Sequence, residues 1–292
     1  SLQDMATIME MVWATGYATG ILLLMQFILP AIVKFFYKKP KDEVRLYEKK
    51  WKRDTVYLYQ MPGTSNLPSI SPFCLKVESF LRLHKINYER RYFLVGRGIN
   101  GKLPFVELNG EHHTDSTIIL KRLAFHFKLQ EYATPEDALF GHCISRMADC
   151  HTYNIFLHYK VTHNAANLYK GMAGGLVPEI AIDMTAPFIT PFVSGWIHRR
   201  LNDVFGKFTD EEYREMTRKD LTVLQDILGE KKFLLGDAMN SADCTVFGHL
   251  AAMLYLDQNS HPVFLLKSHQ FVPLRQYIER VRDQLFGGKF HM

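Results

Sequence analysis

Two residues suited to thiol chemistry, Ser71 and Cys74, lie within a short segment at residues 69–76. The segment follows an alternating apolar run at residues 55–60, which predicts a strand, and it leads into an amphipathic helix that ends near Leu83. A helix N-terminus carries about half a positive charge, so it stabilises a thiolate or another anion beside it. The sequence therefore predicts a sulfur-binding or anion-binding site at this helix start.

The elements that would position this helix start follow along the chain. Residues 103–108 form an apolar run that predicts a strand, and Asn109-Gly110 after it is typical of a tight hairpin. Asp115 or Ser116 would cap the next helix, because a side-chain oxygen there accepts hydrogen bonds from the first helical amides. The predicted order is a strand at 55–60, a helix at 75–83, a strand at 88–95, a strand at 103–108, a very short strand at 111–113 and a helix after residue 116.

The composition excludes several classes of protein. Of the 292 residues, 47% are hydrophobic and 22% are charged, so the chain can form a large core. The net charge of +5 is mild, and we do not expect nucleic acid as a partner. The cysteines are too few and too scattered for a disulfide framework, which favours a reducing compartment. They are Cys74, Cys143, Cys150 and Cys244.

The N-terminal run at residues 11–33 is almost wholly apolar and long enough to span a bilayer as a helix. Aromatic residues flank it and lysines follow it, so the positive-inside rule places the rest of the chain in the cytoplasm. A cleaved signal peptide is the alternative, but such a peptide begins with basic residues and ends with small ones. We expect a transmembrane anchor at 1–37, a charged and helical linker at 38–53, and a single-pass membrane protein whose globular part is cytoplasmic.

The rest of the chain reads as helical. Capping motifs are expected at Thr209 with Glu212 and at Asn240 with Asp243. Histidines and cysteines gather at residues 136–164, but no zinc or metalloprotease motif is present, so structural or pocket-lining roles are favoured over metal binding. Four aromatic residues could line an apolar pocket or belong to the core: Tyr153, Phe156, Tyr159 and Tyr169. The predicted domains are a thioredoxin-like domain at 54–130 and an all-helical domain at 135–292.

Several motifs of the first domain, in this order, resemble those of the glutathione S-transferases. They are Ser-Pro-Phe-x-x-Lys at residues 71–76, Gly-Lys-Leu-Pro and the Asn-Gly hairpin at 101–110, and the Asp-Ser pair at 115–116. More narrowly, residues 68–76, residues 246–251 and the N-terminal apolar run are similar to the failed axon connections group, which includes the nematode cadmium-responsive proteins and is related to metaxins. The resemblance implies an α+β fold, with a thioredoxin-like domain followed by an all-helical one.

The resemblance also implies glutathione as co-substrate and gives each matching residue a role. Ser71 would donate a hydrogen bond to the glutathione thiolate and hold the pKa of that thiol down. Leu103, before a cis Pro104, would pair its backbone with the cysteinyl part of the tripeptide. Asp115 and Ser116 would bind the γ-glutamyl end beside a helix N-terminus.

The stretch between the second strand and Pro104 is shorter than in typical transferases, where a helix helps to bind the glycine end of glutathione. Arg97 and Lys102 are the nearby cations that would replace this helix. Cys74 takes the position of the second cysteine of dithiol members of the thioredoxin class. It would form a mixed disulfide with glutathione or remain a buried thiol.

These observations lead to two hypotheses of different classes. The first is a membrane-anchored transferase-like protein that joins glutathione to an apolar electrophile in a stress, xenobiotic or metal response. The second is a non-catalytic metaxin-like adaptor, or an axonal interaction protein, that keeps the transferase fold. The short stretch before Pro104 and the predicted anchor favour it. A redox enzyme using Cys74 is a third interpretation. The sequence leaves both a monomer and a dimer open.

Overall fold

The computed structural model describes residues 46–290 apart from 65, 94–97, 174–178, 257–258 and 288–289. The predicted anchor at 1–37 and most of the predicted linker lie outside the described residues. Among the residues that are described, none forms a helix that is both long enough and apolar enough to span a bilayer. The single-pass membrane localisation predicted from the sequence is therefore wrong by this test, and we do not retain it.

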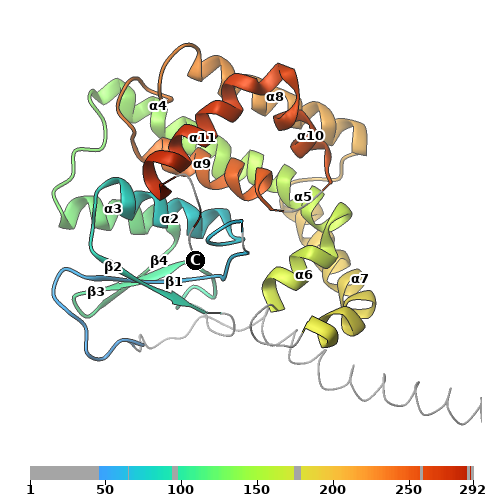
Figure 1. Ribbon diagram of the computed structural model, residues 1–292, viewed down its shortest axis with the longest axis horizontal. Coiled ribbons are helices and arrows are strands. Elements are labelled where there is room, and N and C mark those ends of the chain that lie inside the picture. The colour runs from blue at the N-terminus through green and yellow to red at the C-terminus, as the bar shows by residue number, and fades with distance from the viewer. Residues whose placement is uncertain are drawn as a thin grey trace, which may run out of the picture. The chain divides into compact units, whose positions relative to one another are not determined.

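A four-stranded sheet with strand order β2-β1-β3-β4 forms one layer of the fold (Figure 1). Neighbouring strands pair in parallel for β1 and β2 and antiparallel for the other two pairs. The strands are β1 (Val56–Gln60), β2 (Tyr88–Tyr92), β3 (Phe105–Leu108) and β4 (Glu111–Thr114). Each strand was expected, although β2 ends before residue 95 and β3 begins after residue 103.

One face of the sheet packs against two helices. Helix α2 (Pro72–Leu83) joins β1 to β2, and α3 (Ser116–His126) follows β4. Successive side chains of a strand point to opposite faces, so alternate residues of β1 and β3 reach these helices. The resulting cluster includes Val56, Leu58 and Val106 from the strands, Val77 and Phe80 from α2, and Ile119 and Leu123 from α3.

The opposite face is covered by the chain that precedes β1. Residues 46–53, which we call the strap, contain no helix, in contrast to the helical linker expected there. The buried carboxylate of Glu107 accepts hydrogen bonds from the amides of Tyr47 and Glu48, each at 2.8 Å. The Tyr47 ring also lies 5.5 Å from the Tyr59 ring and 5.4 Å from the Phe105 ring. The strap is held on the sheet by these contacts with Glu107, Tyr59 and Phe105, and not by bonds within a helix.

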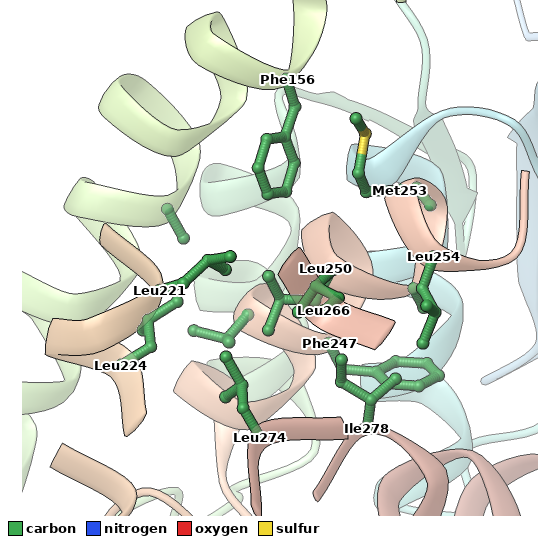
Figure 2. Packing of buried hydrophobic residues seen from close by; sticks show 14 of the residues in the cluster. Phe156, Leu221, Leu224, Phe247, Leu250, Met253, Leu254, Leu266, Leu274 and Ile278 are labelled. Carbon is green, nitrogen blue, oxygen red and sulfur yellow. The ribbon is translucent and has the colours of Figure 1, made fainter. Parts of the chain in front are cut away.

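The second part of the fold is built from the helices that follow α3 along the chain (Figure 1). They are α4 (Pro135–Arg146), a π-helical turn (Met147–Thr152), α5 (Tyr153–His163), α6 (Ala165–Ala173), α7 (Glu179–Val204), α8 (Asp210–Leu228), α9 (Ser241–Leu254), α10 (His261–Lys267), a 3₁₀ turn (His269–Phe271) and α11 (Val272–Phe286). Figure 2 shows Phe247 and Leu250 of α9 among leucines of α8, α10 and α11. All fourteen residues of α9 are buried, so α9 is the central helix.

Helices α2 and α9 cross closely and join the two parts. A Cβ atom added at Gly248 of α9 would lie 2.7 Å from the carbonyl oxygen of Pro72 and 3.0 Å from the amide nitrogen of Lys76. Only a residue without a side chain permits this approach. The crossing fixes the first turn of α2, where the predicted site begins, against the buried centre of the helical part.

Candidate functional site

Strand pairing brings the predicted site segments to one end of the sheet. Tyr59 of β1 stands opposite Phe105 of β3, which stands opposite Thr114 of β4. Because these pairs are antiparallel, the chain leaving β1, the chain entering β3 and the chain leaving β4 meet at this end. The predicted site residues in these segments are Ser71, Leu103, Pro104, Asp115 and Ser116.

Ser71 is the N-cap of α2. Its backbone is extended, and its Oγ accepts a hydrogen bond from the Cys74 amide at 3.5 Å, a distance longer than is usual for such bonds. Its own amide donates to Ser69 Oγ at 3.3 Å, and Pro72 takes the first helical position. The half-buried hydroxyl therefore lies at the positive end of the helix dipole, where it can donate to an anion.

Cys74 faces the interior of the fold and is completely buried. Burial raises the pKa of its thiol, although hydrogen bonds from Ser71 and from the Met61 backbone act in the opposite direction. A thiol whose pKa is raised in this way holds little thiolate near neutral pH, and the thiolate is the reactive form. The surroundings of Cys74 therefore favour an unreactive buried thiol over a redox nucleophile.

The other two segments have the local geometry that their sequence suggests. The Leu103–Pro104 peptide bond is cis, and Pro104 is buried directly before β3. Asp115 is the N-cap of α3, and its carboxylate accepts hydrogen bonds from the amides of Thr117 at 3.0 Å and Ile118 at 3.2 Å. Ser116 is buried in the first turn of α3.

Lys102 and Arg97 are the two cations predicted near the glycine end of glutathione. Lys102 is exposed, and its backbone closes a turn in which the Gly98 amide donates to the Lys102 carbonyl at 3.0 Å. Arg97 lies outside the described residues. The residues described between β2 and β3, which are 93 and 98–104, form turns rather than a helix.

A buried charge cluster beneath the start of α2 was not foreseen from the sequence. Lys76 Nζ lies 2.7 Å from Asp149 Oδ2, and the two side chains are 2% and 6% exposed. The same carboxylate is 2.6 Å from Arg146 Nη2 and 3.0 Å from His249 Nε2. Burial opposes the ionisation of Asp149, but the hydrogen bond from His249 and the charge of Lys76 outweigh it and lower the pKa to about 2. Lys76 belongs to the Ser-Pro-Phe-x-x-Lys motif, but nothing local to it indicates Asp149.

Aromatic rings adjoin this cluster through His249. The Phe73 ring lies 4.7 Å from the Tyr153 ring and 5.2 Å from the His249 ring. Phe156 and Tyr159, by contrast, belong to the core of the helical part. Of the aromatic residues suggested for an apolar pocket, Tyr153 is therefore the one packed against Phe73, two residues after Ser71.

No metal centre is found among the described side chains, where no group of three or more histidine, cysteine, aspartate or glutamate residues could hold an ion. Two of the histidines at residues 136–164 contact protein side chains instead. His151 Nδ1 lies 2.9 Å from Asp220 Oδ2, and the His158 ring stacks on the Tyr213 ring at 3.6 Å.

Comparison with known proteins gives two family matches and curated relatives. The model named Glutathione S-transferase N-terminal domain matches residues 72–167, and that named Glutathione S-transferase, C-terminal domain matches residues 217–281. Failed axon connections from Drosophila melanogaster is 30% identical over 261 residues, which is 85% of this chain, and the chain spans 62% of the length of that relative. Isoprene-epoxide–glutathione S-transferase from Rhodococcus sp. is 25% identical over 242 residues, covering 79% of this chain and 98% of that protein.

Solved structures show the same fold. Glutathione transferase GSTFuA3 from Phanerochaete chrysosporium superposes with a TM-score of 0.55 at 14% identity, covering 80% of this chain and 99% of that chain. Beta-etherase LigF from Sphingobium sp. superposes with a TM-score of 0.52 at 16% identity, covering 78% and 94%. Both transferase domains match in order, and one curated relative aligns with most of the sequence. The chain belongs to the glutathione S-transferase-like family that includes Failed axon connections.

Proposed function

We propose that this chain binds glutathione where α2 and α3 begin and joins it through its sulfur to an apolar electrophile. The observation that carries the proposal is the position of Ser71. Its hydroxyl lies at the N-terminus of α2, at the end of the sheet where the chain also enters β3 and leaves β4. A hydroxyl donor and a helix dipole aimed at one point stabilise a thiolate there and lower the pKa of the bound thiol.

The contacts to the rest of the tripeptide follow from the family resemblance. The backbone of Leu103 would pair with the cysteinyl part of glutathione. Ser116 would receive the γ-glutamyl carboxylate at the positive end of the α3 dipole, with Asp115 near the amino group. Lys102 and Arg97 would pair with the glycine carboxylate. In this arrangement the protein holds the ligand by its charged ends and leaves the sulfur at Ser71.

The reaction needs no further cofactor. The glutathione thiol loses its proton to solvent, and the thiolate sulfur attacks an electrophilic carbon. With an epoxide, a carbon–sulfur bond forms, the ring carbon–oxygen bond breaks, and the oxygen takes a proton from water. Phe73 and Tyr153 offer an apolar wall for the electrophile near Ser71. An apolar epoxide is the first substrate class to try, because one relative is named for isoprene epoxide.

A second candidate function is a non-catalytic adaptor that keeps the fold. The observation in its favour is that turns, and no helix, occupy the residues described between β2 and β3. The strap covers the face of the sheet opposite α2 and α3. A weaker hold on the glycine end would lower the affinity for glutathione. The two candidates therefore differ in whether glutathione binds.

The experiment is calorimetric titration of the full chain with glutathione, followed by conjugation assays with styrene oxide and 1-chloro-2,4-dinitrobenzene. We expect saturable binding in the millimolar range or below, and conjugation with at least one electrophile. Ser71→Ala should lower the conjugation rate about tenfold or more, since a rise of one pKa unit in the bound thiol is about a factor of ten in thiolate.

Two variants of the same helix serve as controls. Ser79→Ala removes a buried hydroxyl that has no hydrogen-bond partner among the described residues, so it should leave the rate unchanged. Cys74→Ala should also retain activity. Absence of glutathione binding would support the adaptor, whereas loss of activity only in Cys74→Ala would support redox chemistry. Full activity of Ser71→Ala would remove Ser71 from its assigned role.

A further inference from the structure

A cavity of about 190 Å³ lies where α3, α4 and α9 meet, and its lining includes none of the proposed glutathione-binding residues. Thr117 and Lys121 of α3 form one side, Arg146 of α4 another, and Ser241 of α9 closes it. We call it the α3–α4 cavity. It is large enough for a small organic molecule, and the proposed transfer reaction makes no use of it.

The charged groups of the α3–α4 cavity are mainly cationic. Lys76 and Arg146 both line it and share one carboxylate, that of Asp149, which also bonds to His249. Lys121 adds a third cation, and its exposed side chain makes no hydrogen bond or ion pair within the described part of the chain. These cations therefore exceed the carboxylate charge that balances them.

One carboxylate, that of Glu131, also lines the α3–α4 cavity. Burial raises its pKa, against a hydrogen bond from Ser241 that acts in the opposite direction. Even with Glu131 counted as charged, the three cations Lys76, Lys121 and Arg146 face two carboxylates, those of Asp149 and Glu131, so the balance of charge is positive.

Arg146 supplies the guanidinium group of the α3–α4 cavity. Its Nη2 donates to Thr117 Oγ1 at 2.7 Å and to Asp149 Oδ2 at 2.6 Å, and these bonds hold the side chain in place beside the cavity. Guanidinium groups are well suited to phosphate, because their planar donors match its oxygens.

We infer that the α3–α4 cavity binds a small phosphomonoester. The phosphate would lie between Lys121 and Arg146, and the organic part would contact Leu120 and Ala138, which also line the cavity. Two cations from different helices, one exposed and one held in place by Asp149, give a doubly charged group a defined position. This binding is independent of the proposed glutathione site.

The test is calorimetric titration of the full chain with phenyl phosphate, with benzoate and phenol as comparison ligands. We expect saturable binding of one phenyl phosphate per chain, weaker binding of benzoate and none of phenol. Lys121→Gln should weaken phenyl phosphate about tenfold, which is the usual effect of losing one charge-assisted hydrogen bond. Arg122→Gln is the matched control, because Arg122 is exposed, lies next to Lys121 on α3 and does not line the cavity. This variant should bind phenyl phosphate with unchanged affinity.

Four results would overturn the inference. The first is no saturable binding of phenyl phosphate. The second is equal weakening by Lys121→Gln and Arg122→Gln, which would indicate general attraction to a basic surface. The third is competition with glutathione that disappears in Ser71→Ala, which would assign the ligand to the proposed glutathione site. Tighter binding of benzoate than of phenyl phosphate would replace the phosphomonoester by a carboxylate ligand and equally contradict the inference.

Discussion

At the scale of single residues, His158 shows what burial does to a titratable side chain in this fold. Its ring stacks on Tyr213 at 3.6 Å with an interplanar angle of 10°. Neither ring nitrogen has a hydrogen-bond partner among the described residues. Burial, with a smaller contribution from His198, lowers the pKa of His158 to about 4. The side chain acts as a flat apolar ring at neutral pH, and protonation would place an unpaired charge in the core.

We predict that His158 makes the fold sensitive to mild acid. An unfolded histidine takes up a proton near pH 6.5, whereas folded His158 does so only near pH 4, so folding stability falls as the pH decreases between these values. His158→Phe should keep the stacking and remove about 2 kcal/mol of that loss. The measurement is urea unfolding at pH 7.5, 6 and 5. The control His269→Gln changes an exposed histidine and should retain the full loss. An equal acid slope in His158→Phe and the unchanged protein would contradict the prediction.

At the scale of secondary-structure elements, the crossing of α2 and α9 depends on a glycine inside a helix. Because glycine has more conformational freedom than alanine in the unfolded chain, Gly248 destabilises helix α9 by about 1 kcal/mol relative to alanine. Its lack of a side chain allows the backbone of α2 to approach at Pro72 and Lys76. The tertiary contact therefore outweighs the local preference of the helix.

We predict that Gly248→Ala destabilises the fold by about 2 kcal/mol, in spite of the better helix propensity of alanine, because the new methyl group meets backbone atoms that cannot rotate away. It should also weaken glutathione binding, since α2 begins with the proposed site. Gly195→Ala in α7 is the matched control. A Cβ there meets no atom within 4 Å, so this variant should gain up to about 1 kcal/mol. Chemical denaturation measures the free energy of unfolding of both variants. If Gly248→Ala is more stable than the unchanged protein, the crossing can accept a methyl group and the prediction is wrong.

At the scale of the whole molecule, the two parts described here share their cores. Leu67 and Leu75, from the part that contains the sheet, lie in the large cluster of the helical part. Cys244 of α9 lies in the cluster between the sheet and α2. The ion pair between Lys76 and Asp149 joins the same two parts through a buried contact. These shared contacts couple the stability of the part that contains the sheet to that of the helical part.

We predict one cooperative unfolding transition, with calorimetry and circular dichroism giving the same midpoint. Asp149→Ala should lower the stability by about 3–5 kcal/mol, because it leaves Lys76 charged and buried without its partner. Replacing both residues, as Lys76→Met with Asp149→Leu, should recover only the part of that loss that is due to Lys76, because Arg146 and His249 still lose their bonds to Asp149. Asp183→Asn, in an exposed pair with Lys170, should cost at most about 1 kcal/mol. Two separate transitions, or equal losses in Asp149→Ala and Asp183→Asn, would contradict this coupling.

Elements that depend on near neighbours could be predicted from the sequence. The capping boxes at Thr209 with Glu212 and at Asn240 with Asp243 are both present. Asn109-Gly110 turns the chain between β3 and β4, with positive φ at both residues. In each case the interacting groups lie within a few residues, so their spacing alone determines the geometry.

The sequence by itself thus determined the strands, the helix starts and the presence of Ser71 at one of them. The tertiary structure decided what surrounds these elements. Asp149 meets Lys76 from 73 positions away and His249 from 100, and Glu107 holds the strap from 60 positions away. Contacts at such separations arise when whole elements pack against each other. A local pattern records only the backbone and caps of one element, so it could not indicate which carboxylate, cation or aromatic ring that packing would bring beside the site.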